Sequence, residues 1–114
     1  MTIKRGDIYL AALDPVVGRE IAKTRPVVVV SNDLNNEHGG TITILPLTSQ
    51  RLKKVYPFEL LLSKGDANLP KKSKIKADQI RTLDKSRLIK RFGKLSEKQI
   101  NLIGKAIKIH LALP

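Results

Sequence analysis

A short charged loop before the most apolar stretch of the chain carries residues that could bind and act on a phosphate. Arg25 precedes Pro26, and a residue before proline is restricted to extended conformations. A guanidinium on such a fixed backbone can hold a phosphate through two parallel hydrogen bonds, and its charge does not titrate away. Glu20 lies five residues earlier and could pair with Arg25 or accept a proton. The plainer interpretation of this spacing is a surface salt bridge, which contributes little to stability.

A hydroxyl group follows a predicted strand. The alternation of Thr41-Ile42-Thr43-Ile44-Leu45 indicates a half-buried strand, after which the chain continues into hydroxyl and amide side chains. Thr48 could donate a hydrogen bond to a phosphate oxygen from this rigid position. The alternative is an ordinary β-branched strand residue.

The excess positive charge of the chain lies entirely in its second half. Residues 1–50 carry five basic and five acidic side chains, whereas residues 51–114 carry 17 basic against five acidic ones and hold the whole net charge of +12. Such a one-sided field attracts polyanions. The expected partner is therefore nucleic acid, an acidic protein or both, and a charge that only confers solubility is the alternative. The basic runs that could position phosphates, or equally form solvated strand faces, are Arg51, Lys53, Lys54, Lys71, Lys72, Lys74 and Lys76.

Composition argues against several other kinds of site. The chain has no cysteine, which excludes disulfides, zinc knuckles and thiol catalysis. His38 and His110 are separated by most of the chain, and no Asp, Glu and His residues cluster at metal-ligand spacing, so neither a metal nor a cofactor is predicted. The four aromatic residues do not alternate along a basic strand, which argues against a base-stacking sheet.

One domain, residues 1–114, must position these groups. Strands are predicted at 6–13, 26–31, 41–45, 58–62, 73–80 and 88–92, with a turn or short helical turn at 32–36 after the second of them. The run 27–30 is β-branched and should be buried on both faces. The segment 77–88 mixes amides and charges that could meet base edges or stitch loops together.

The C-terminal region predicts one amphipathic helix. Ser96 and Gln99 match a capping box, and the apolar stripe that follows consists of Ile100, Ile103, Ile107 and Leu111. Several short strands with one terminal helix predict a mainly β (α+β) fold, a small antiparallel β-barrel. The longest apolar run is too short to cross a bilayer, and the start lacks an apolar run of signal-peptide length. We therefore expect a cytoplasmic protein without membrane contact.

Five segments in order resemble the MazF/PemK family of toxin endoribonucleases, from about residue 4 to the terminal helix. They are Arg5-Gly6-Asp7-Ile8-Tyr9, then Gly18-x-Glu20-x4-Arg25-Pro26-Val27-Val28-Val29, Pro46-Leu47-Thr48-Ser49, Tyr56-Pro57-Phe58-Glu59 and Asp78-Gln79-Ile80-Arg81-Thr82-Leu83-Asp84-Lys85-Ser86-Arg87-Leu88.

The resemblance implies an SH3-like barrel that works as a homodimer and cleaves single-stranded RNA (mRNA) sequence-specifically without a metal. The 2′-hydroxyl attacks, leaving 2′,3′-cyclic phosphate and 5′-hydroxyl ends. The implied catalytic residues are Arg25 and Thr48, with Glu20 contributing in some members. A cognate antitoxin with an acidic, flexible C-terminal segment is the implied partner. RNA contacts are expected from Arg19, Lys23, Thr24, Ser49, Gln50, Arg51, Lys53, Lys54 and Gln79.

The chain departs from the family at one loop position and leaves one further function open. Many members have glycine two residues before the arginine, where this chain has Lys23, a change expected to stiffen the loop. A non-catalytic basic RNA-binding barrel would show the same charge without needing Glu20, Arg25 and Thr48 together. A gyrase poison of the CcdB type is disfavoured, because the chain ends Leu111-Ala112-Leu113-Pro114 and contains no tryptophan.

Overall fold

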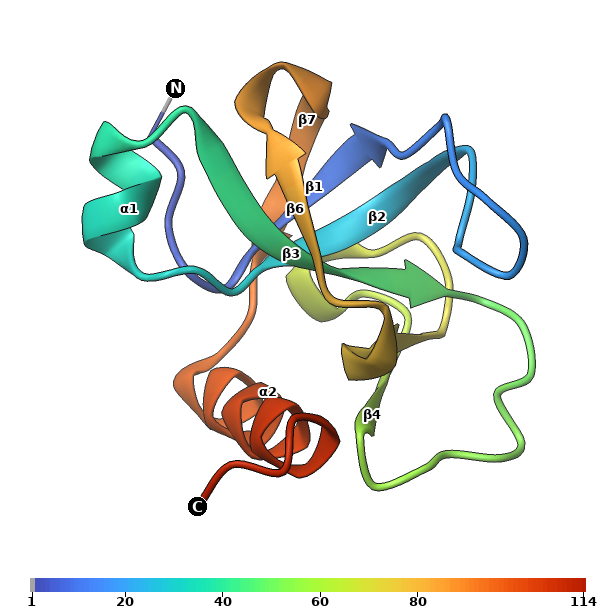
Figure 1. The fold of residues 1–114 in the computed structure, drawn as a ribbon. Coiled ribbons are helices and arrows are strands. Elements are labelled where there is room, and N and C mark those ends of the chain that lie inside the picture. Colours follow the sequence, from blue (N-terminus) through green and yellow to red (C-terminus); the bar gives the residue numbers. More distant parts are fainter. Residues whose placement is uncertain (1) are drawn as a thin grey trace.

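The computed structural model describes residues 2–114. The elements are, in chain order, β1 (Asp7–Ala12), β2 (Thr24–Val29), α1 (Asp33–His38), β3 (Thr41–Thr48), β4 (Glu59–Leu62), η1 (Asp66–Asn68), β5 (Ser73–Lys76), η2 (Ala77–Gln79), β6 (Arg81–Asp84), η3 (Lys85–Arg87), β7 (Leu88–Lys94) and α2 (Glu97–His110). The η elements are single 3-10 turns. Figure 1 shows α2 below β1, β2 and β3, with β4 beside it.

The strands form one antiparallel sheet that stays open. Their order is β4-β5-β3-β2-β1-β7, and β6 pairs with β3. The prediction of a mainly β antiparallel fold with a terminal helix is confirmed, but the expected barrel does not close within residues 2–114, because no ladder joins β4 to β7. Other elements cover these two edges: α2 packs against β4 and η1 against β7. From η1, the Asn68 amide donates a hydrogen bond to the Phe92 carbonyl of β7 at 2.8 Å.

Strand β3 is the centre of the sheet and runs three residues beyond the predicted strand 41–45. Its first half pairs with β6, its middle with β2 and its end with β5. The single strand predicted at 73–80 is wrong, because β5 ends at Lys76 and the 3-10 turn η2 separates it from β6. Alternation along the chain does not distinguish one long strand from a strand and a turn.

The apolar run of β2 is buried on both faces, as predicted. Val27 and Val29 pack in one core cluster with residues such as Ile42 and Leu83, and Val28 packs in the other with Leu45. Because successive strand residues point to opposite faces, a sheet with a core on each side requires this unbroken run of valines. This burial on both faces explains why the part of β2 that follows Arg25 is rigid.

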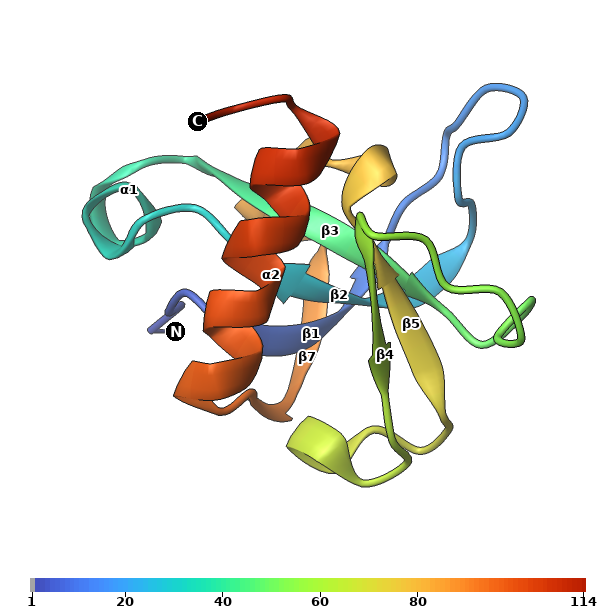
Figure 2. The same ribbon diagram turned by 90° about the horizontal axis from the view of Figure 1, so that it is seen from below.

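Helix α2 begins at the predicted capping box. The Ser96 hydroxyl accepts a hydrogen bond from Gln99 N–H, and the Gln99 side-chain oxygen accepts one from Ser96 N–H. Ile103 and Ala106 are buried, and Ile100 and Ile107 pack beside them. Figure 2 shows α2 lying across one face of the sheet. Leu111 was expected on this stripe, but it follows the last helical residue and is 46% exposed.

The turn predicted after the second strand is the short helix α1, capped by Asn32, whose side chain accepts a hydrogen bond from Asn35 N–H at 2.8 Å. None of the helices in the described part of the chain is both long and apolar enough to span a membrane.

Candidate active site

The sheet register brings Arg25 and Thr48 together. Strands β2 and β3 pair Val29 with Ile44 and Val27 with Pro46, which is the last pair of this ladder, and Arg25 and Thr48 each lie two residues beyond it. Because alternate residues of a strand point to the same face, Arg25 shares the face of Val27 and Thr48 shares that of Pro46. The two side chains therefore continue the face of Val27 and Val29 beyond the point where the core ends.

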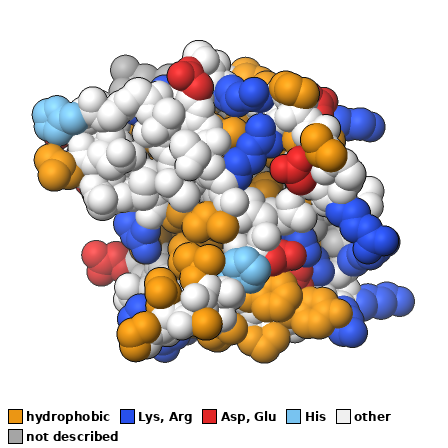
Figure 3. All heavy atoms as spheres, viewed as in Figure 1, with side chains coloured by type: hydrophobic (Ala, Val, Ile, Leu, Met, Phe, Trp, Pro, Cys, Tyr) orange, Lys and Arg blue, Asp and Glu red, His pale blue; other side chains and the backbone are white. Residues whose placement is uncertain are grey.

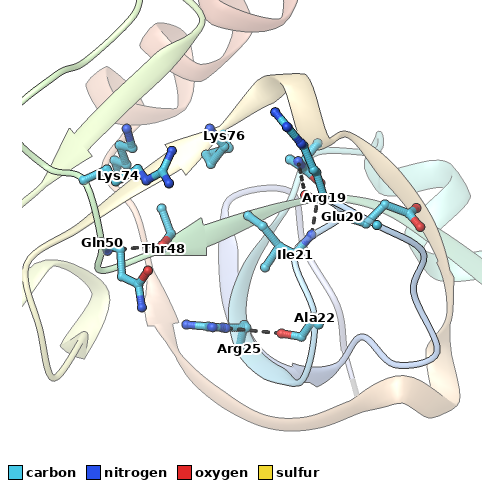
Figure 4. A pocket seen from close by; sticks show the side chains of 12 residues that line it. Arg19, Glu20, Ile21, Ala22, Arg25, Thr48, Gln50, Lys74 and Lys76 are labelled. Atoms are coloured by element: carbon cyan, nitrogen blue, oxygen red, sulfur yellow. Dashed lines mark hydrogen bonds between the residues drawn. The ribbon is translucent and has the colours of Figure 1, made fainter.

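Both residues line one cavity of about 660 Å³, which Figure 4 shows from close by. Two loops border it: the β1–β2 loop (residues 13–23), which leads into Arg25, and the β3–β4 loop (residues 49–58), which follows Thr48. The cavity is lined by Gly18, Arg19, Glu20, Ile21, Ala22, Arg25, Thr48, Gln50, Arg51, Lys74, Lys76 and Gln79. Figure 3 shows Lys and Arg side chains gathered on the side of the molecule where these loops lie in Figure 1.

The structure thus brings together all three predicted catalytic residues and four of the nine predicted RNA-binding ones. Thr24 and Ser49 line a smaller neighbouring cavity of about 230 Å³, to which Arg25 also contributes. Lys53 and Lys54 lie further out, along a shallow hollow of the β3–β4 loop. Lys23 is the last residue of the β1–β2 loop and is exposed.

Arg25 is anchored at one end and open at the other. Its Nε donates a hydrogen bond to the Ala22 carbonyl at 3.2 Å, and its terminal nitrogens bond to none of residues 2–114. The predicted Glu20–Arg25 pair is not formed. One oxygen of Glu20 accepts a hydrogen bond from Val17 N–H at 2.6 Å, and Figure 4 shows the carboxylate pointing away from Arg25. The guanidinium can therefore bind an incoming anion without first breaking an ion pair.

The Thr48 hydroxyl is oriented by its own strand end. Its Oγ1 accepts a hydrogen bond from Gln50 N–H at 3.2 Å. Because a hydroxyl both accepts and donates, this contact leaves the O–H of Thr48 to donate into the cavity.

Gln79 positions the β1–β2 loop. Its Oε1 accepts a hydrogen bond from Ile21 N–H at 3.2 Å, and its Nε2 donates to the Arg19 carbonyl at 3.3 Å. Arg81 supports the start of the same loop by donating to the Leu13 carbonyl at 2.8 Å. Segment 77–88 could either contact base edges or bond loops to one another, and these contacts match the second interpretation.

Sequence reasoning missed Glu59, which organises the far wall of the cavity. Its side chain is fully buried and accepts hydrogen bonds from Lys74 Nζ at 3.1 Å and Lys76 Nζ at 2.7 Å. Burial alone would raise the pKa of Glu59, but the hydrogen bonds from Lys76, Tyr56 N–H and Lys74 hold that pKa below its ordinary value. A signal was available, because the strand predicted at 58–62 carries apolar side chains on both faces, and a carboxylate buried among them requires a partner.

The cationic character of the cavity comes chiefly from arginine. Lys74 and Lys76 were expected to position phosphates, but Glu59 pairs with both and Asp78 lies 3.6 Å from Lys76 Nζ. By contrast, the three arginines of the cavity have no carboxylate within 4.0 Å among residues 2–114; they are Arg19, Arg25 and Arg51. In the same part of the chain, no three His, Asp or Glu side chains are placed to hold a metal ion.

Comparisons with known proteins find relatives of similar sequence and fold. "Endoribonuclease MazF" of Staphylococcus saprophyticus is 40% identical over 111 residues, covering 97% of this chain and 92% of that protein. The crystal structure of MazF from Deinococcus radiodurans superimposes with a TM-score of 0.84 at 25% identity and covers 99% of both chains. A mycobacterial endoribonuclease in complex with its cognate antitoxin has a TM-score of 0.81 at 26% identity, covering 98% of this chain and 97% of that one.

The sequence pattern of one family matches nearly the whole chain. It spans residues 4–111 and describes the PemK-like, MazF-like toxins of type II toxin–antitoxin systems. This range includes β1, both loops that border the cavity, and α2. The expected resemblance is therefore confirmed, and the chain belongs to the PemK-like, MazF-like toxin family.

Proposed function

We propose that this protein is a sequence-specific, metal-independent endoribonuclease that cleaves single-stranded RNA, with cytoplasmic mRNA as its substrate. The observation that carries the proposal is that Arg25 and Thr48 line one cavity together with Arg19 and Arg51, and that within residues 2–114 none of these arginines has a carboxylate partner. Two relatives are named endoribonucleases, which supports the assignment. The basic side chains around the cavity suit a polyanion of several phosphates.

In the proposed reaction, the ribose 2′-oxygen attacks the adjacent phosphorus while the bond from phosphorus to the 5′-oxygen breaks. The 2′-hydroxyl gives up its proton and the leaving 5′-oxygen gains one, so the products carry a 2′,3′-cyclic phosphate and a 5′-hydroxyl. Glu20, which lines the cavity, is the candidate proton acceptor. Arg25 and Thr48 stabilise the extra negative charge on the non-bridging oxygens as it develops.

The same cavity explains how the toxin would be neutralised. An acidic, flexible segment of a cognate antitoxin would place carboxylates against Arg19, Arg25 and Arg51 and exclude RNA. One of the structural relatives is an endoribonuclease bound to its antitoxin, which supports this partner. A homodimer of this chain is the proposed active assembly.

Incubation of the purified protein with a long single-stranded RNA in EDTA tests the function. We expect discrete fragments whose 5′ ends accept phosphate from polynucleotide kinase without prior phosphatase treatment, and the folded Arg25→Ala variant controls for contaminating nucleases. A gel shift without fragments would instead assign the non-catalytic RNA-binding module. Fragmentation that requires a divalent cation would overturn the proposed chemistry.

A further inference from the structure

The β3–β4 loop is tied to the sheet by a buried ammonium group. Lys74 lies on β5 with 5% of its side chain exposed, and its Nζ donates to Glu59 and to the Lys54 carbonyl in the middle of the loop, at 3.1 and 3.0 Å. Glu59 also accepts a hydrogen bond from Tyr56 N–H at 3.0 Å, at the end of the loop. One buried ion pair therefore contacts the loop at two points.

Little else holds the backbone of residues 49–55. Among residues 2–114, its one other hydrogen bond joins Gln50 N–H to Thr48 Oγ1. Arg51, Lys53 and Lys54 are exposed, and Arg51 has a φ of 54°, in the left-handed region that disfavours residues with a side chain. Local conformational preference therefore does not maintain the shape of this loop.

We propose that Lys74 is a positioning residue that clamps the β3–β4 loop and thereby holds Gln50 and Arg51 on the cavity. Glu59 fixes the Lys74 ammonium, and the ammonium fixes the Lys54 carbonyl. The clamp itself follows from the contacts above, whereas its effect on RNA rests on the proposed endoribonuclease function. A loop ordered before binding loses less conformational entropy on binding, so the clamp favours affinity and sequence selectivity.

Lys76 provides a matched control within the same ion cluster. It binds the other oxygen of the Glu59 carboxylate at 2.7 Å but donates to no loop carbonyl. Replacing either lysine with methionine leaves Glu59 with one ammonium partner, so the Glu59 carboxylate stays paired in both variants. Lys76→Met also removes the ammonium 3.6 Å from Asp78, which lies on η2 and not on the β3–β4 loop. Both lysines line the cavity, and therefore a difference between the two variants reports on the contact with Lys54.

Limited trypsin digestion of the native protein tests the clamp without RNA, because Arg51, Lys53 and Lys54 are cleavage sites within the loop. We expect Lys74→Met to be cut there about tenfold faster than the unmodified protein and Lys76→Met to stay within about threefold, because cleavage follows the population of the open loop. Lys71 and Lys72, in the next connection, provide the internal reference. Equal acceleration in both variants, or none in Lys74→Met, would overturn the proposal.

Kinetics with RNA then separates positioning from catalysis. We expect Lys74→Met to raise KM about tenfold and to relax the choice of cleavage sequence, while kcat changes less than about threefold, because Arg25 and Thr48 lie on strands. An unchanged KM would overturn the link to specificity.

If the unmodified protein cleaves no RNA, the proposed function fails, but digestion still decides the clamp. If Lys74→Met does not fold, Glu59→Gln combined with Lys74→Met removes both charges, and a loop still protected in that protein overturns the clamp.

Discussion

The two loops that border the cavity are fixed by different kinds of interaction. The β1–β2 loop is held by neutral or always-charged groups, the Gln79 amide and the Arg81 guanidinium, which bond to its backbone. The β3–β4 loop depends on the buried carboxylate of Glu59 and the ammonium of Lys74. Each loop adjoins one candidate catalytic residue, Arg25 or Thr48. The comparison shows that the contacts that hold the β3–β4 loop on the sheet include a titratable carboxylate, whereas those that Gln79 and Arg81 make with the β1–β2 loop do not.

The largest expected effect follows from breaking the charged anchor. Glu59→Gln leaves Lys74 buried without its carboxylate, and we expect a loss of about 3–5 kcal/mol in the free energy of unfolding at pH 7. Because the pKa of Glu59 is lowered in the folded protein, its contribution is present above its ordinary value of 4.5 and is lost as the pH falls through the lowered pKa. Urea unfolding at several pH values should show the two proteins converging below about pH 4.5.

The matched control for that experiment is Gln79→Leu, which disturbs the other loop. Its difference from the unmodified protein should stay constant over the same pH range, since an amide does not titrate. A pH-independent effect of Glu59→Gln would remove the distinction between the loops.

The next effect concerns the residues that adjoin the two loops. We expect Arg25→Ala and Thr48→Val each to lower the rate of RNA cleavage about 100- to 1,000-fold, or about 2.7–4 kcal/mol, because each removes one preorganised donor. If both act on the same phosphate, the double variant should lose less than the product of the two factors. Single-turnover kinetics measures this, with circular dichroism and low-salt RNA binding to establish that each variant folds and binds. Full activity in a folded Arg25→Ala protein would contradict the proposed site.

A smaller effect is expected from loosening the neutral anchor. Gln79→Leu removes two hydrogen bonds from the β1–β2 loop, and we expect a loss of about 2 kcal/mol in unfolding free energy. Trypsin should also cut faster after Arg19 and Lys23. Gln50→Leu is the control, because the Gln50 side-chain amide forms no hydrogen bond with either loop among residues 2–114, and its backbone N–H is unchanged by the substitution. Unchanged proteolysis in Gln79→Leu would mean that other contacts determine the loop's shape.

The smallest effect on stability concerns one residue with a strained backbone in each of the two loops. Lys23 and Arg51 have φ values of 68° and 54°, which cost a residue with a Cβ about 1–2 kcal/mol. Glycine relieves this strain in the folded state, but it also increases the conformational entropy of the unfolded chain, which offsets part of the gain. We expect Lys23→Gly and Arg51→Gly each to stabilise the protein by about 0.5–1 kcal/mol in urea unfolding.

The two glycine variants should differ in RNA binding. Only Arg51 lines the cavity, so Arg51→Gly alone should weaken binding and lower the slope of log affinity against log salt by about 1. Equal salt slopes would show that Arg51 contacts no phosphate.

The position of Lys23 also explains how the chain departs from its family. The resemblance led us to expect glycine here, and Lys23 has the left-handed backbone that glycine adopts freely. That the lysine stiffens the loop stays a prediction. The positive φ itself could not be foreseen, because it depends on the path of the loop between β1 and β2.

Several features could be predicted because their causes lie close together in the chain. The valines of β2 reflect burial on both faces, the pair Ser96 and Gln99 marks the start of α2, and Pro26 restricts the backbone at Arg25. The placement of Arg25 beside Thr48 was expected from a family resemblance, and the β2–β3 register supplies its physical reason.

The sequence by itself determined where the chain is apolar, where its helices begin and which side chains could bind phosphate, since these properties depend on residue type and short-range spacing. Only the tertiary structure decided that β6 pairs with β3, that the Gln79 amide binds a loop 58 residues away, and that Glu59 meets lysines 15 and 17 residues later. Strand order and register determine which distant partner a buried polar group finds. Local sequence does not show which distant partner that will be. For this reason Lys74 and Lys76 were interpreted as phosphate ligands, whereas in the structure they pair with Glu59 at the far wall of the cavity.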